Sequence, residues 1–193
     1  LAPMFKFLRK CPDQVHKALR NITDTLRDYC TALIEESGCH AIMFDTLYAS
    51  QTIMRASMWD EWEGPYIQEL AELVHGKDTM VMIHNCGDGI YFKEQIDRMH
   101  PQAISTLFLP PDCKTMEECK EKYGDQITII GSIPPSNIVT DTEEQIRAEC
   151  RREMDAYKKN GGFILSTGCE YPAQLPDHYA RVIVEEARTY GKY

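Results

Sequence analysis

Two residues with metal-binding side chains, His84 and Cys86, stand two positions apart at the end of an apolar run that covers residues 80–84. If this run is a β-strand, the alternation of side chains places both on the same face of the sheet. Imidazole and thiolate are both good ligands for zinc. Cys169, which follows a second apolar run at residues 163–166, could supply a third ligand. Three protein ligands with one open position are typical of catalytic zinc.

Simpler roles compete for each of these residues. A histidine bonded to backbone beside a packing cysteine explains His84 and Cys86 without a metal, and the spacing alone favours that interpretation. Asp45 closes another apolar run, where helix capping and catalysis are equally compatible with its position. Glu170 and Ser132, taken singly, are more typical of turns than of catalysis.

The elements that would position these residues alternate between strand and helix. Short, continuously apolar runs separated by amphipathic segments predict a parallel sheet covered by helices. Strands are expected at residues 41–45, 80–84, 103–108, 127–131 and 163–166, and helices at 12–37, about 59–74, about 92–96, 116–123, about 140–157 and 177–188. In such folds chemistry lies at the carboxyl ends of the strands, where Asp45, His84 and Cys169 fall.

The count of about five βα units predicts an α/β fold of the TIM (β/α)8-barrel type that is only partly present. A complete barrel needs eight units and typically about 250 residues. No glycine-rich phosphate loop supports a nucleotide-binding, doubly wound alternative. The sequence shows no internal repeat or linker, so residues 1–193 are expected to form one unit.

Local signals bound two of the helices. Pro12 is expected to open the first helix, and Gly38 to end it. Two capping boxes are available for the helix that runs to about residue 157. They would pair Thr140 with Glu143 and Asp141 with Glu144.

Composition narrows the class of protein. A formal net charge of -9 argues against nucleic acid or an anionic membrane as the main partner, and no apolar run reaches the roughly 20 residues of a membrane span. The first residues do not read as a signal peptide. The eight cysteines are scattered through predicted elements, which favours free thiols in a reducing cytoplasm over a disulfide scaffold.

Four stretches resemble the uroporphyrinogen decarboxylase family. They are AIMFDT at 41–46, IHNCG at 83–87, IGSIPP at 130–135 and GCEYP at 168–172. In the third stretch Ser132 replaces the usual asparagine of the family. The resemblance covers nearly the whole chain and implies the C-terminal portion of the family's TIM barrel, with the N-terminal strands missing.

The last stretch resembles the zinc-dependent, corrinoid-linked methyltransferase branch, because Cys169 stands where decarboxylases carry a histidine. The resemblance implies a zinc site of His84, Cys86 and Cys169, and methyl transfer between a separate corrinoid protein and a small thiol, methyl ether or methylamine. Asp45 and Glu170 could position the substrate or orient the ligand histidine. An acid that can approach zinc in some members is replaced here by Leu107.

Two other functions stay open. One is a decarboxylase that acts on a tetrapyrrole without metal, and the other is a non-catalytic barrel fragment that binds a partner. The oligomeric state, including a homo-oligomer, is also left open by the sequence.

Overall fold

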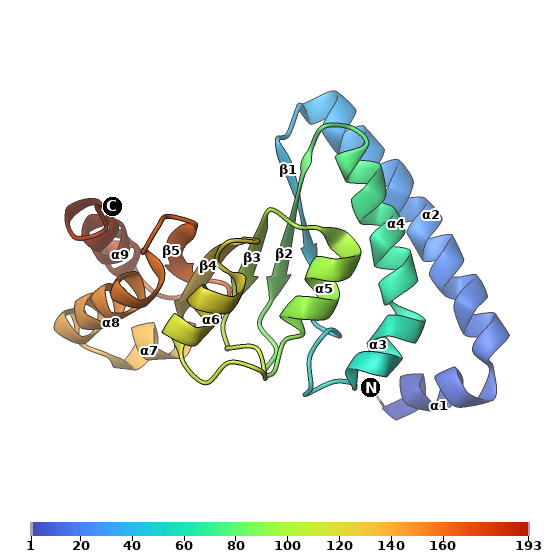
Figure 1. Cartoon of the computed structure of the whole chain (residues 1–193), viewed down its shortest axis with the longest axis horizontal. Coiled ribbons are helices and arrows are strands. Elements are labelled where there is room, and N and C mark those ends of the chain that lie inside the picture. The colour runs from blue at the N-terminus through green and yellow to red at the C-terminus, as the bar shows by residue number, and fades with distance from the viewer. Residues whose placement is uncertain (1, 193) are drawn as a thin grey trace.

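The computed structural model describes residues 2–192, and in that part of the chain five parallel strands alternate with helices (Figure 1). The strands are β1 (Ala41–Asp45), β2 (Met80–Asn85), β3 (Ala103–Thr106), β4 (Thr128–Ile133) and β5 (Phe163–Thr167). They pair in chain order, β1-β2-β3-β4-β5, and every pair is parallel. A doubly wound sheet would reverse direction at a switch point, whereas a barrel keeps this order. The prediction of a partial TIM-barrel-type fold is therefore confirmed.

The helices are α1 (Ala2–Lys10), α2 (Pro12–Ser37), α3 (Ala56–Trp62), α4 (Gly64–His75), α5 (Phe92–Met99), α6 (Met116–Tyr123), α7 (Pro135–Thr140), α8 (Glu143–Tyr157) and α9 (His178–Thr189). As expected, Pro12 lies in the first turn of α2. Gly38 ends the helix in the left-handed conformation, at φ 64°, and its N–H donates to the Ile34 carbonyl. A residue without Cβ adopts this conformation at no steric cost.

Several sequence-based boundaries were wrong. The helix expected over residues 59–74 is two helices, which meet at Glu63. The strand expected over residues 103–108 ends at Thr106, and the one expected over 127–131 continues to Ile133. Helices α1 and α7 were not predicted.

Neither predicted capping box forms, because α7 already includes Thr140. The box lies further along the chain, where the Gln145 N–H donates to the Thr142 hydroxyl and the Thr142 N–H donates to the Gln145 side chain. Asp141 instead follows the end of α7.

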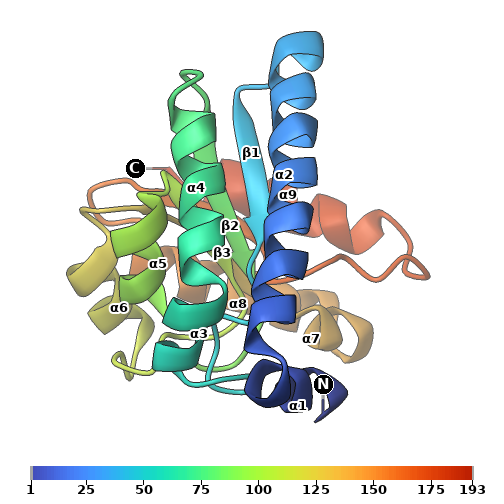
Figure 2. The same cartoon turned by 90° about the vertical axis from the view of Figure 1, so that its right-hand side faces the viewer.

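The core lies between the strands and the helices packed around them. In β2, the buried side chains of Val81 and Ile83 alternate with those of Met80, Met82 and His84, which are at least partly exposed. Helices α2 and α4 lie beside β1 and β2, whereas α8 and α9 flank β4 and β5 (Figures 1 and 2). The helices therefore cover one face of the sheet. The other face and the carboxyl ends of the strands, which carry the polar residues, are left accessible.

Side chains on the uncovered face of the edge strands are exposed. Met43 of β1 and Ile164 of β5 each have half of their surface open to solvent. A groove of about 640 Å³ runs beside β1, between α2 and α4. Among residues 2–192 no helix combines the length and apolar character that crossing a bilayer requires. All eight cysteines are free thiols in the structure.

Candidate metal centre

Three side chains with metal-binding atoms converge at the carboxyl ends of β2 and β5. One nitrogen of His84 and the sulfurs of Cys86 and Cys169 lie within 4.8 Å of one another, and each residue is half-buried. Tetrahedral zinc with bonds of about 2.0–2.3 Å would hold such atoms roughly 3.8 Å apart. The three donors therefore need only small adjustments to share one ion.

The chemistry of this donor set fits zinc better than a hard cation. Thiolate and imidazole ligands select zinc and similar ions, whereas magnesium and calcium prefer oxygen. Burial raises the pKa of the Cys86 thiol to about 11, and the neighbouring Cys169 and the charge of Asp45 act in the same direction. Without a cation the Cys86 sulfur therefore keeps its proton at neutral pH, and metal binding would release that proton.

The His84 ring is held from the neighbouring strand. Its Nδ1 lies 3.1 Å from the Ser105 hydroxyl oxygen, and the two residues face each other in the β2–β3 register. This contact was not predicted from the sequence.

The turn that carries Cys86 is fixed by Asn85, whose side chain is fully buried. The Asn85 amide donates to the carbonyls of Thr46 (2.6 Å) and Ala49 (3.3 Å), and its oxygen accepts the Gly87 N–H at 2.8 Å. One side chain thus ties the end of β2 to the loop after β1. Buried polar groups with such complete partners rigidify their surroundings.

The loop that carries Cys169 is fixed by hydrogen bonds to the Thr167 side chain and to β4. The Thr167 hydroxyl donates to the Cys169 carbonyl at 2.7 Å, and the Gly168 N–H donates to the Ile133 carbonyl at 2.9 Å. Gly168 lies so close to β3 that a Cβ there would be 2.7 Å from the Leu107 Cα. The close approach holds the start of this loop against the end of β3, which pairs with β2, and the other two donors lie at the carboxyl end of β2.

The structure places Asp45 and Glu170 beside the cluster and not in it. Asp45 is paired with His84 in the β1–β2 register, and its exposed carboxylate is near enough to raise the pKa of Cys86. Glu170 is exposed and follows Cys169 directly. Within residues 2–192 neither side chain makes a hydrogen bond or an ion pair, so both are free to meet a ligand.

A second carboxyl group near Asp45 was missed by the sequence reading. Glu63, at the junction of α3 and α4, lines the groove beside β1 together with Asp45. The pKa of Glu63 is raised to about 7, mainly by burial and less by the Asp45 charge, against the opposing effect of Trp59. The apolar spacing over residues 59–74 continues across this junction, so the sequence did not indicate that the helix breaks there.

Ser132 belongs to the framework of the site. It lies inside β4 and not in a turn as expected. Its N–H donates to Glu153 Oε2 of α8, and its hydroxyl donates to Glu153 Oε1 at 3.2 Å. The side chain is occupied with α8, which removes Ser132 from the candidate catalysts.

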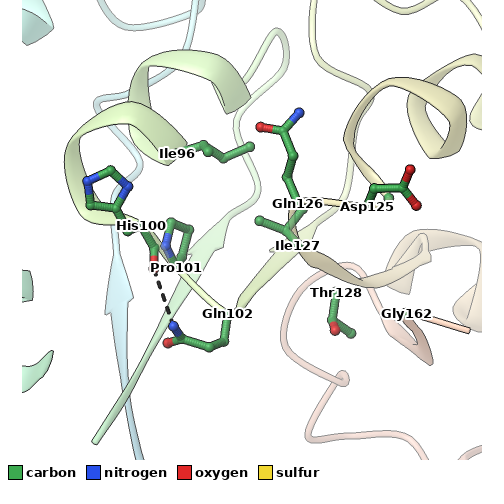
Figure 3. Close-up of a pocket in the computed structure, with 10 residues that line it drawn as sticks. Ile96, His100, Pro101, Gln102, Asp125, Gln126, Ile127, Thr128 and Gly162 are labelled. Atoms are coloured by element: carbon green, nitrogen blue, oxygen red, sulfur yellow. Dashed lines mark hydrogen bonds between the residues drawn. The ribbon is translucent and has the colours of Figure 1, made fainter. Parts of the chain in front are cut away.

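A cavity at the opposite end of the sheet carries no comparable chemistry (Figure 3). It measures about 510 Å³ and opens where the chain enters β3, β4 and β5, with Gln102, Ile127 and Gly162 in its wall. The Gln102 side chain there donates to the His100 carbonyl at 3.4 Å. The candidate metal centre lies at the other ends of these strands.

Comparisons with known proteins agree with this architecture. A family model described as uroporphyrinogen decarboxylase (URO-D) matches residues 1–190. Curated relatives include uroporphyrinogen decarboxylases from Prochlorococcus marinus (strain MIT 9211; 25% identity, 92% of this chain and 48% of the relative) and Alcanivorax borkumensis (20% identity, 90% and 48%). Among solved structures, a methyltransferase from Methanosarcina mazei superposes with a TM-score of 0.77 at 18% identity, covering 97% of this chain and 53% of its own.

The extent of these matches fits five strands of an eight-stranded barrel. The chain spans about half the length of the curated relatives and of the solved structure that it matches. At 18% identity the structural likeness shows the fold alone. Because the family model covers all but the last three residues, the chain belongs to the uroporphyrinogen decarboxylase family.

Proposed function

We propose that the protein is a zinc-dependent methyltransferase that moves a methyl group between a corrinoid carried by a partner protein and a small thiol, methyl ether or methylamine. The observation that carries the proposal is the convergence of His84, Cys86 and Cys169 at the carboxyl ends of the strands. Two sulfurs and one nitrogen leave one position of a tetrahedral ion open. The solved methyltransferase with the same fold is compatible with this proposal.

A zinc ion bound there would hold a substrate thiol as thiolate at neutral pH or polarise the heteroatom of a methyl donor. The protein's own contribution is to hold the donors and the substrate. Asn85 and the Gly168 loop fix the two cysteines. Asp45 and Glu170, both exposed beside the cluster, would orient the substrate.

The second candidate is a decarboxylase that needs no metal. It is favoured by the curated relatives, which are uroporphyrinogen decarboxylases at 20–25% identity. Against it stands Cys169, where the resemblance to decarboxylases implies a histidine. In this candidate, replacing Cys169 by serine would leave activity intact.

The third candidate is a non-catalytic barrel fragment. It is favoured by the exposed apolar side chains of the edge strands, against which a partner would pack. A fragment of this kind has no reason to retain three metal-binding side chains in one cluster. Metal binding therefore separates it from the first candidate.

The test is the zinc content of the protein purified at its natural length. We expect close to one zinc per chain, and a large loss in the variants His84→Ala, Cys86→Ser and Cys169→Ser. Cys39→Ser is the matched control, because Cys39 is an equally half-buried free thiol outside the cluster. Absence of zinc together with full activity of Cys169→Ser would overturn the proposal and favour the decarboxylase.

X-ray absorption at the zinc edge then separates the substrate classes. Added thiol that increases the number of sulfur neighbours from two to three identifies a thiol acceptor. An unchanged count, with methyl transfer from an ether or amine to reduced cobalamin, identifies a methyl donor. Free methylcobalamin and free reduced cobalamin serve as probes in place of the corrinoid protein.

A further inference from the structure

We propose that Ser105 is a positioning residue for the candidate metal centre: its hydroxyl accepts the Nδ1–H of His84 and so presents Nε2 to the metal. This inference rests on the proposed function, because it concerns the same three donors. Ser105 itself contributes no metal-binding atom to the cluster.

The geometry places the two side chains in direct contact. His84 and Ser105 are opposite each other in the parallel β2–β3 register, so their side chains project from the same face of the sheet. The Ser105 Oγ lies 3.1 Å from His84 Nδ1, and only 7% of Ser105 is exposed. Water therefore has little access to compete for this hydrogen bond.

The bond constrains the tautomer of the ring. A neutral imidazole carries one N–H and one lone pair, and only the nitrogen with the lone pair binds a metal. When Nδ1 holds the proton and donates it to Ser105, the lone pair is on Nε2. Metal-binding histidines are commonly held in this way by an acceptor behind the ring, which fixes both tautomer and orientation.

The acceptor is a neutral hydroxyl, and this affects the charge of the site. Two thiolates balance the two positive charges of zinc, and a neutral histidine adds none. A carboxylate behind His84 would add a negative charge to a region that already contains Asp45. With Ser105 there, the ion meets an incoming thiolate at lower electrostatic cost, because like charges repel.

The experiment measures metal affinity by competition with a chromophoric chelator, using zinc and cobalt(II). We expect Ser105→Ala to bind either ion about 10–100-fold more weakly, with an altered cobalt(II) absorption spectrum. Ser105→Thr keeps the hydroxyl and is expected to restore most of the affinity. Thr106→Val is the matched control, because it removes the next hydroxyl of β3, which bonds to the Phe108 carbonyl.

The outcomes separate this inference from the proposed function. If the wild-type protein binds neither ion, the proposed function fails. If it binds both ions and Ser105→Ala binds them equally well, only the role of Ser105 is refuted. Nitrogen-15 NMR of histidine in the zinc-loaded wild-type protein gives a test that needs no variant: a proton on Nδ1 supports the proposal, and zinc on Nδ1 overturns it.

Discussion

Replacing Glu153 by glutamine is expected to stabilise the protein increasingly as the pH rises from 5 to 9. Glu153 lies on α8 with no exposed surface. Burial raises the pKa of its carboxyl group to about 8, and the charge of Glu149 adds to the effect, whereas the Ser132 hydrogen bonds and Arg152 oppose it. The folded protein therefore holds a proton that the unfolded chain releases near its ordinary pKa of 4.5.

The magnitude follows from linkage. Because its folded-state pKa is raised, the contribution of Glu153 to the free energy of unfolding is greatest below pH 4.5 and falls as the pH rises to about 8. One pKa unit corresponds to about 1.4 kcal/mol, so the complete loss is about 5 kcal/mol. Less than about 1 kcal/mol of this is lost by pH 5 and most of it by pH 9. Such a loss is a large part of a typical stability of about 5–15 kcal/mol.

Glutamine removes the ionisation and can keep the local contacts. Its amide oxygen can accept the Ser132 N–H, and its amide nitrogen can donate to the Ser132 hydroxyl. Any fixed cost of the substitution is the same at every pH. The advantage of Glu153→Gln over the wild type should therefore grow by about 4 kcal/mol between pH 5 and pH 9.

Urea unfolding followed by circular dichroism at pH 5, 7 and 9 measures this difference. Glu144→Gln is the matched control, because it makes the same substitution in the same helix at an exposed position. A constant difference between Glu153→Gln and the wild type across the three pH values would refute the reasoning. It would mean that Glu153 ionises equally in the folded and unfolded chains.

Two further predictions concern the framework of the site, and a third concerns the ion pairs between α8 and α9. Asn85→Leu leaves the buried Gly87 N–H without a partner and removes one of two hydrogen bonds from each of the Thr46 and Ala49 carbonyls. It should lower the free energy of unfolding in urea by about 1–3 kcal/mol; a loss below about 0.5 kcal/mol would contradict it. Gly168→Ala places a methyl group against the Leu107 backbone and should displace Cys169, so that zinc affinity falls at least about tenfold; unchanged zinc affinity would show that the loop adapts. Glu186→Gln weakens charged bonds to two arginines of α8 and should cost about 2 kcal/mol at pH 7. Those arginines lower the pKa of Glu186, so the difference in stability between the variant and the wild type should shrink as the pH falls below 4.5. Thermal unfolding of both proteins at pH 3 and pH 7 tests this; an equal difference at the two pH values would contradict it.

The strands were predictable because burial on the helix-covered face demands apolar side chains in short runs. The ends of β3 and β4 were less predictable. The apolar run of β3 continues to Phe108, but pairing stops where Thr106 turns its hydroxyl to the Phe108 carbonyl. Conversely, β4 includes the polar Ser132, because Glu153 supplies partners from another element. Hydrogen bonds between distant segments decide such boundaries, and a periodic pattern does not contain them.

The helix boundaries failed for a related reason. The apolar spacing from Trp59 to Val74 continues across the junction at Glu63, so periodicity gave one helix where there are two. Pro65 was the available signal, since proline is favoured in the first turn of a helix. Neither of the two capping boxes expected for α8 forms, and Thr142 with Gln145, which was not predicted, caps the helix instead.

In the candidate site, too, local features were predictable from the sequence, whereas contacts between distant strands were not. His84 and Cys86 are linked by strand alternation, which is a local property. Cys169 is distant in sequence, and its approach depends on the consecutive parallel order of the strands, which the resemblance to a barrel family implied. Ser105 had no such signal, because a serine inside an apolar run resembles any small core residue. Only the β2–β3 register places the Ser105 side chain next to the His84 ring. Residues that hold a metal-binding histidine from a neighbouring strand can therefore be found only once the strand register is known.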